Sequence, residues 1–351
     1  MYFSWVDQNS GSAVLKYSTW EGSWSPPEVV AKGSNWFVNW ADYPMIAATK
    51  EGMLIAHYLA KSSPGTYSYD INLLLRNEKW GQALVPHKDS TLTEHGFLTV
   101  IPLRESFLLA WLDGRNTGAP HRDHHGHQGA MTLRSAVVQA DGRLADEVEL
   151  DDRVCDCCQT TGALTDSGPV VLYRDRSSEE IRDISIIRKV DGKWSEPRTV
   201  YADQWEISGC PVNGPRAVAA GNQLAIIWYT AANDAPQVKV IFSFDGGASF
   251  GPPLIIDDKN PLGRVDIVWL NSQKVMTSWL GRNDGGETVI QARIVDSRGY
   301  MEPVIAVAES SEARGSGFPQ MERLDDEVFF AWTAQEAEGN KRIELARLRV
   351  N

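Results

Sequence analysis

Short stretches of alternating apolar and polar residues run through the whole chain and are separated by polar turns. Residues 184–188 and 238–243 each alternate in this way just before a turn, and residues 216–220 and 224–228 form two more such stretches. A period of two residues is typical of a half-buried strand. No helical period of useful length competes with it. The pattern therefore predicts an all-β protein built from antiparallel hairpins.

One polar turn recurs about every 50 to 65 residues, a period typical of repeat folds. Each copy is followed by a large apolar residue: Trp24, Trp80, Leu144, Trp194, Phe250 and Tyr300. The turn closes a hairpin, and two further strands precede the next copy, so each repeat has four strands. Four antiparallel strands per repeat form a β-propeller blade. We predict a single β-propeller domain over residues 1–351, with six blades favoured, the termini sharing one, and seven blades as the alternative.

The composition argues against several classes of protein function. The 13 tryptophans, 29 glycines and 17 prolines suit short strands joined by many turns. A net charge of −12 without a Lys/Arg stripe argues against nucleic-acid binding. No run approaches the roughly 20 apolar residues of a membrane span. The chain has no signal-peptide pattern and begins inside a strand pattern, so we favour an extracytoplasmic location, periplasmic or secreted, for a processed protein.

The turn at residues 243–250, Ser-Phe-Asp-Gly-Gly-Ala-Ser-Phe, matches the Asp-box S-x-D-x-G-x-x-[WF]. It resembles the sialidase (BNR-repeat) superfamily of propellers, and five degenerate copies extend the resemblance over nearly the whole chain. Residues 36–42, 93–96, 154–160, 173–177 and 209–214 also resemble a bacterial group of exo-alpha-sialidase-like proteins with a Cys-x-Cys-Cys motif. The resemblance implies that the Asp-box joins the third and fourth strands of a blade, on the face away from the active site.

This position of the turn fixes where other loops emerge. The loops between second and third strands, and the crossovers between blades, must lie on the opposite face. That face receives the cysteine run, Cys210, the histidine-rich residues 121–127, Glu94-His95, residues 113–115 and residues 173–176. Their convergence predicts a functional site.

All four cysteines fall in two of these segments, Cys155, Cys157 and Cys158 in one run and Cys210 in another. Thiolates are soft ligands that select copper(I) or zinc, so we predict a Cys/His metal-binding or redox site. A disulfide between Cys210 and the run, or inert thiols, are the alternatives. Imidazoles suit the same metals, and the candidate histidines are His95, His121, His124, His125 and His127. The four loop histidines could instead bind metal adventitiously, and His95 could be a general base.

The resemblance also implies an arginine triad that grips a carboxylate, a tyrosine nucleophile with a glutamate base, and an aspartate acid. The candidates are Arg115, Arg174, Arg176, Asp175, Tyr173 and Glu94. The family's Arg-Ile-Pro motif is absent, because residues 42–46 lack the arginine, so whether the protein is an enzyme stays open. One alternative function is a glycoside hydrolase acting on an anionic sugar. Another is a non-catalytic propeller that presents this face to a glycan or a partner protein, with its arginines in salt bridges between blades.

Overall fold

The computed structural model describes residues 1–9, 11–117, 129–335 and 340–350, and the chain folds as two compact units, residues 1–156 and 157–351. Among the described residues the regular structure is β-strand, apart from two single 3₁₀ turns, η1 (Ala232–Asp234) and η2 (Arg314–Ser316). No helix in these parts of the chain has the length and apolar character needed to cross a membrane.

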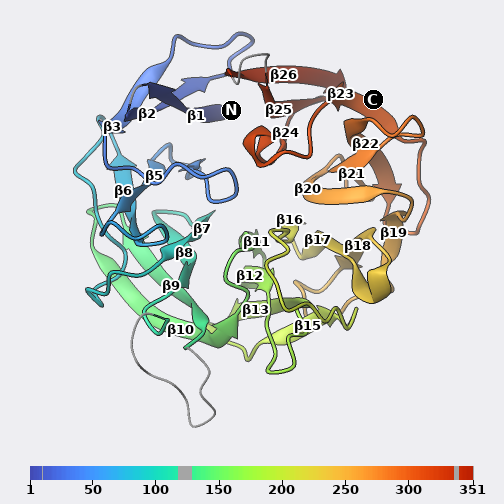
Figure 1. Ribbon diagram of the computed structural model, residues 1–351, viewed down its shortest axis with the longest axis horizontal. Helices are drawn as coiled ribbons and strands as arrows, with labels where there is room; N and C mark the ends of the chain where they lie inside the picture. Colours follow the sequence, from blue (N-terminus) through green and yellow to red (C-terminus); the bar gives the residue numbers. More distant parts are fainter. Residues whose placement is uncertain (10, 118–128, 336–339, 351) are drawn as a thin grey trace. The chain divides into compact units, whose positions relative to one another are not determined.

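The first unit contains three antiparallel sheets, each formed by strands that follow one another in sequence (Figure 1). They are β1 (Tyr2–Asn9), β2 (Ser12–Thr19) and β3 (Glu28–Gly33); β4 (Ile46–Ala48), β5 (Leu54–Lys61) and β6 (Tyr69–Arg76); and β7 (His95–Pro102), β8 (Ser106–Asp113), β9 (Met131–Gln139) and β10 (Leu144–Val154). Leu84 adds a fourth, one-residue partner to the second sheet by bridging to Leu73 in β6.

The second unit contains four sheets of the same type. They are β11 (Thr161–Thr165), β12 (Gly168–Arg174), β13 (Ile184–Val190), β14 (Lys193–Trp194) and β15 (Arg198–Tyr201); β16 (Arg216–Ala220), β17 (Gln223–Thr230), β18 (Gln237–Ser243) and β19 (Leu254–Asp257); β20 (Pro261–Trp269), β21 (Lys274–Arg282), β22 (Thr288–Asp296) and β23 (Ile305–Glu309); and β24 (Gln320–Leu324), β25 (Glu327–Gln335) and β26 (Lys341–Arg349).

The predicted all-β propeller fold is confirmed, and its blade count is seven, the alternative to the favoured six. The two terminal segments each build a three-stranded sheet of their own, β1–β3 and β24–β26, instead of completing one shared sheet. In β1–β3 the recurring turn lies between the last two strands, so the first strand of the blade is the missing one. That the whole chain behaves as one domain stays a prediction.

The recurring turns lie where the sequence placed them, between the third and fourth strands of a blade. In the Asp-box between β18 and β19, Asp245 Oδ1 accepts hydrogen bonds from the Ser249 N–H and the Ser243 hydroxyl, both at 2.8 Å. The Gly247 N–H donates to Ser243 Oγ at 2.8 Å. Gly246 and Gly247 have φ of 68° and 81°, a conformation that favours glycine. The role of this box is to hold the turn.

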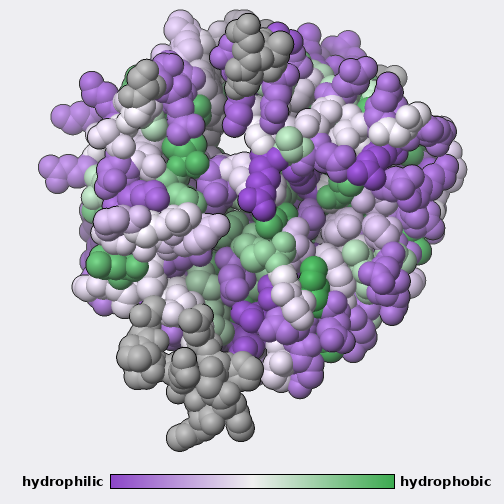
Figure 2. Space-filling view, in the orientation of Figure 1, coloured by the Kyte–Doolittle hydropathy of each residue, from purple (hydrophilic) through white to green (hydrophobic). Residues whose placement is uncertain are grey.

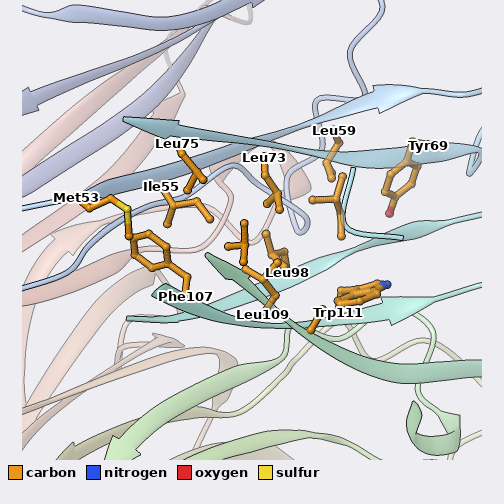
Figure 3. Close-up of a cluster of buried hydrophobic side chains, with 13 residues drawn as sticks. Met53, Ile55, Leu59, Tyr69, Leu73, Leu75, Leu98, Phe107, Leu109 and Trp111 are labelled. Carbon is orange, nitrogen blue, oxygen red and sulfur yellow. The ribbon is translucent and has the colours of Figure 1, made fainter. Parts of the chain in front are cut away.

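The core of the first unit lies between neighbouring sheets. Leu73 and Ile55 of one sheet face Leu98 and Leu109 of the next, with Tyr69 at one end (Figure 3). Full burial of one such leucine or isoleucine contributes on the order of 2 kcal/mol. Hydrophilic residues predominate on the face shown in Figure 2, where hydrophobic residues form only small, separate patches. The sheets are therefore held by their inner faces, and the loops at the strand ends are available for chemistry.

Candidate functional site

Two clusters of polar side chains lie back to back in the first unit, where β6 begins beside β7. Tyr69 and Asp70 begin β6, and Glu94 and His95 stand at the start of β7. Tyr69 and Glu94 form a parallel bridge, and the Tyr69 N–H donates to the Thr93 carbonyl at 3.1 Å. Successive side chains of a strand point to opposite faces. Tyr69 and Glu94 therefore project one way, and Asp70 and His95 project the other.

The tyrosine cluster consists of Asp42, Tyr69 and Glu94. The Tyr69 hydroxyl lies 2.6 Å from Glu94 Oε1 and 3.0 Å from Asp42 Oδ2. A phenol has a single proton to donate, so both contacts are hydrogen bonds only when one carboxyl group carries a proton. Burial raises the pKa of Asp42 to about 7, against the lowering effect of hydrogen bonds from the Phe97 N–H and Tyr69. The cluster thus holds an extra proton near neutral pH.

The other two members of the cluster have raised pKa values as well. Burial raises the pKa of Glu94 to about 7; the Tyr69 hydrogen bond opposes this shift, and the nearby Asp42 charge adds to it. Burial and the charges of Asp42 and Glu94 raise the pKa of Tyr69 well above its ordinary value. Groups with strongly perturbed pKa values concentrate at functional sites. Tyr69 keeps its proton, and the two carboxyl groups titrate in the physiological range.

A bulge in β7 builds this cluster. The pairing of β7 with β8 shifts register between Gly96 and Thr99, and Phe97 between them has a φ of 52°. Bulges re-aim backbone and side chains beside functional sites. Here the bulge turns the Phe97 N–H toward Asp42. Only glycine fits at position 96, because a Cβ there would overlap the carboxylate of Asp42 and the ring of Tyr69.

The histidine cluster, on the other side of the strand ends, is built on two stacked imidazoles. The rings of His87 and His95 lie 3.7 Å apart at 8°. Asp89 Oδ2 lies at one edge of both rings, 3.1 Å from His87 Nδ1 and 3.2 Å from His95 Nε2. Asp70 Oδ1 lies at the other edge, 3.5 Å from His87 Nε2 and 3.2 Å from His95 Nδ1. Each ring therefore has a carboxylate on both sides.

A buried ion pair completes this cluster. Arg115 donates to both oxygens of Asp113 at 2.8 Å and lies 3.2 Å from Asp89 Oδ2. Asp113 is fully buried and also accepts a 2.9 Å hydrogen bond from Trp111 Nε1. Burial would raise the pKa of Asp113, but these donors and His95 hold it below its ordinary value. The guanidinium group of Arg115 therefore forms its ion pairs with carboxylates of the protein itself.

The two histidines differ in their affinity for a proton. Burial disfavours protonation of His95, but Asp70, Asp113 and Asp89 outweigh it and raise its pKa. Burial and the positive charge on His95 lower the pKa of His87. When no other cation is bound, His95 is the ring that takes up a proton.

The cysteines form a sulfur group where the second unit begins. Cys157 and Cys210 are joined by a disulfide. The sulfurs of Cys155, Cys157 and Cys158 lie within 4.8 Å of one another, and Cys155 and Cys158 are buried and outside the disulfide. Cys210 is exposed. The predicted convergence of the run with Cys210 is confirmed, and the disulfide alternative is the state that the structure presents.

Loop packing in the second unit brings Cys210 to the run. The crossover after β15 passes the crossover before β11, where the Gly214 N–H donates to Gln159 Oε1 at 3.1 Å. A Cβ at position 214 would overlap the backbone of Gln159, so the two chains approach closely only with glycine there. This contact places residue 210 beside residue 157.

The arginine-rich segment of the second unit forms contacts within the protein. Arg174 is 1 % exposed and donates to the carbonyl oxygens of Asn213, Arg182 and Tyr229 at 2.6–2.9 Å. Arg176 pairs with Glu180 at 2.7 Å. Both arginines are thus held by the protein itself, but through backbone carbonyl groups and an ion pair within one loop, not through the salt bridges between blades that the sequence suggested.

The two remaining candidates of this segment are placed in the same way. Tyr173 is fully buried in β12. Asp175 accepts a hydrogen bond from the Ser185 hydroxyl at 2.9 Å. Catalytic roles for Tyr173, Arg174, Asp175 and Arg176 stay predictions.

The structure places Glu94 in the tyrosine cluster and His95 and Arg115 in the histidine cluster of the first unit. His121, His124, His125 and His127 lie outside the described residues. Sequence reasoning missed Asp42, Tyr69, Asp70, His87 and Asp89, none of which was chosen as a candidate site residue. The available signal was positional, because the crossovers between blades were predicted to lie on the same face as Glu94-His95.

Comparisons with known proteins bear on the fold. No protein-family model matches the chain, and no curated protein matches it either. A Dyadobacter fermentans protein of unknown function is 12% identical with a TM-score of 0.55, covering 88% of this chain and 94% of that one. The Hadza microbial sialidase Hz136 is 14% identical with a TM-score of 0.52, covering 97% and 74%.

A third solved structure is the Trypanosoma rangeli sialidase, 12% identical with a TM-score of 0.50. The match covers 86% of this chain but only 54% of the trypanosomal one, so the chain spans about half of that protein. At sequence identities this low, the matches support a similarity of fold and nothing about function. Together with the seven antiparallel sheets, these matches show that the chain has a β-propeller fold similar to that of the sialidases.

Proposed function

We propose that this propeller binds a soft metal ion, copper(I) or zinc, at its four cysteines, and that the Cys157–Cys210 disulfide controls the binding. The observation that carries the proposal is that every cysteine of the chain belongs to one sulfur group. Cysteine thiolates are the ligands that select these ions. A chain with a purely structural disulfide has no need of two further sulfurs beside it.

The disulfide sets the number of available ligands. In the oxidised protein, Cys155 and Cys158 are the two cysteines outside the disulfide. An external dithiol that reduces the disulfide gives its two hydrogens to Cys157 and Cys210 and itself becomes a disulfide. The reduced protein then has four cysteine sulfurs, enough for a tetrahedral zinc site or a lower-coordinate copper(I) site. Exposure of Cys210 gives the reductant access.

Metal titration of the two redox states tests the proposal. Tag-free protein is prepared oxidised or reduced, and copper(I) or zinc is titrated against a chromophoric chelator without oxygen. We expect one ion per reduced chain, and at least tenfold weaker binding by the oxidised chain and by the Cys210→Ser variant. Ser208→Ala, two residues away, is the matched control. Equal metal uptake by the reduced and oxidised proteins would contradict the redox control, and no uptake by either would leave the disulfide a structural crosslink.

A second candidate function, glycoside hydrolysis, is favoured by the tyrosine cluster. Tyr69 Oη lies 2.6 Å from Glu94 Oε1, and the resemblance to sialidases implies a tyrosine paired with a glutamate base. Asp42, with its raised pKa, is the matching proton donor. The test is turnover of fluorogenic sialosides and uronides, with a loss of at least 100-fold in Tyr69→Phe and none in Tyr67→Phe, whose side chain is exposed. Absence of turnover in the wild-type protein would exclude this function for those substrates.

A further inference from the structure

We infer a second metal site, separate from the cysteines, in which His87, His95 and Asp70 bind a borderline divalent cation such as Zn²⁺. Among the described residues, His95 groups with His87 and carboxylates, whereas the clustered cysteines form a group of their own. The site lies wholly within the first unit and does not depend on the proposed function.

Three buried ligand atoms carry this inference. Asp70 Oδ1, His87 Nε2 and His95 Nδ1 lie within 4.8 Å of one another. None of them makes a hydrogen bond of good geometry with the described residues, although Asp70 Oδ1 and His95 Nδ1 are 3.2 Å apart and attract each other when His95 is protonated. His95 is fully buried and His87 is 7 % exposed. Leaving a buried polar atom unsatisfied costs roughly 1–3 kcal/mol, so native proteins rarely leave three together. A shared cation would satisfy all three at once.

The spacing of these atoms suits zinc. Asp70 Oδ1 lies 3.2 Å from His95 Nδ1 and 3.5 Å from His87 Nε2. Ligand atoms that lie about 2.0–2.1 Å from Zn²⁺ at tetrahedral or octahedral angles are roughly 2.9–3.4 Å apart. Because the two rings are stacked 3.7 Å apart at 8°, one imidazole must turn out of the stack before both lone pairs point at a shared ion. Two imidazole nitrogens and one carboxylate oxygen favour Zn²⁺ over Ca²⁺ or Mg²⁺, which prefer oxygen ligands.

Asp89 orients both rings toward this position. Its Oδ2 lies within hydrogen-bond distance of His87 Nδ1 and His95 Nε2, at 3.1 and 3.2 Å. When these nitrogens carry the ring protons, His87 Nε2 and His95 Nδ1 keep their lone pairs and face Asp70. A carboxylate behind a metal-binding histidine, fixing its tautomer, is the usual second layer of a zinc site. Thr91 holds Asp89 in place with hydrogen bonds of 2.6 and 2.9 Å.

Charge also favours a cation here. Three carboxylates, Asp70, Asp89 and Asp113, surround two imidazoles, and among the described residues Arg115 supplies the one permanent positive charge in contact with them. The cluster thus has an excess of about two negative charges when the histidines are neutral, which a divalent ion offsets. The Asp70 side chain is 26% exposed, and this gives the ion a route to solvent.

X-ray absorption spectroscopy and zinc titration test the inference on the full chain. We would use tag-free, oxidised protein in which His121, His124, His125 and His127 are replaced by alanine, so that they cannot contribute ligands. One equivalent of Zn²⁺ is added. We expect a shell of nitrogen and oxygen near 2.0–2.1 Å with imidazole scattering, whereas the cysteine site would give sulfur near 2.3 Å. The two sites are therefore distinguished in one spectrum.

Substitutions of His87 and Asp70 test whether these residues provide the nitrogen and oxygen ligands of the zinc ion. We expect His87→Asn and Asp70→Asn to weaken zinc binding at least 100-fold, with apo melting temperatures that confirm folding. His57→Asn, which replaces another buried histidine of the same unit, should bind zinc as the parent does. Zinc binding that is unchanged in His87→Asn and Asp70→Asn would overturn the site. So would a protein that binds no zinc and whose NMR spectrum shows a proton on both ring nitrogens of His95, because Asp70 and Asp89 would then hold an imidazolium.

Discussion

Replacing Asp42 with asparagine measures what the buried acid of the tyrosine cluster does to stability. Asp42 is 2 % exposed, and burial raises its pKa from 3.8 to about 7. Between these two values the unfolded chain has lost the proton and the folded chain still holds it. Because the folded state then binds more protons, the free energy of unfolding falls as pH rises, and it stops changing above about pH 7.

The size of the effect follows from the shift. One pKa unit corresponds to about 1.4 kcal/mol, so the full shift corresponds to roughly 4 kcal/mol. Between pH 5 and pH 8 about 3 kcal/mol of this change falls within the measured range. Asparagine does not ionise and keeps an oxygen acceptor for Tyr69 and Phe97. The advantage of Asp42→Asn over wild type should therefore grow by up to about 3 kcal/mol from pH 5 to pH 8.

Urea unfolding at pH 5, 6.5 and 8, followed by tryptophan fluorescence and circular dichroism, measures this difference. The comparison of variant with wild type at each pH cancels the shared groups that do not interact with Asp42, whereas Glu94, whose pKa the Asp42 charge raises, contributes to the difference. Asp141→Asn, at an exposed turn in the same unit, is the control and should show no such trend. A difference for Asp42→Asn that stays constant within about 1 kcal/mol, the size of one typical hydrogen bond, would refute a raised pKa at this position.

Three further substitutions test other parts of the fold by their melting temperatures and urea midpoints. Gly96→Ala should destabilise the protein by about 1–3 kcal/mol, because its Cβ meets the Asp42 carboxylate and the Tyr69 ring. The control Gly81→Ala, at an exposed glycine, should change the stability little. Equal effects of the two substitutions would contradict the close approach at Gly96. Asp245→Ala should cost roughly 1 kcal/mol by releasing the Asp-box turn. This loss should shrink toward pH 2, because the protonated carboxyl group accepts weaker hydrogen bonds, and a loss that does not change with pH would contradict the role of the charged form. Arg174→Lys should cost about 2–4 kcal/mol, since a lysine cannot reach all three buried carbonyl groups, and a neutral result would show that solvent satisfies them.

The repeat predicted most of the fold, because each blade has a turn pattern that can be recognised within a short segment of sequence. The Asp-box needs Ser243, Asp245 and glycines within eight consecutive residues, so its spacing is visible in one dimension. The number of blades was harder to predict, since the strand patterns at the two termini fit two halves of one blade. Their separate pairing, β1 with β2 and β25 with β26, depends on contacts that no local pattern specifies.

The candidate site was only partly predictable. The cysteines were found because three of them lie within four consecutive residues, and Cys210 because the crossovers could be placed on one face. Asp42, Tyr69 and His87 come from three separate segments with ordinary surroundings. The bulge at Gly96 and the bridge between Tyr69 and Glu94 place Asp42 and Tyr69 in one cluster and leave His87 beside His95 in the other, and both are features of tertiary structure.

The bridge between Tyr69 and Glu94 has a consequence for how this region tolerates change in chain length. The dipeptides Tyr69-Asp70 and Glu94-His95 each contribute one residue to each cluster. A shift of β6 by one residue would therefore place Asp70 against Glu94 and turn Tyr69 toward the histidines. Like charges would then meet on one side, and a phenol would replace a carboxylate on the other. A single insertion or deletion in residues 62–68 that shifts β6 would therefore abolish the chemistry of two faces at once, whereas the same change at residues 77–79, behind the strand, would spare both.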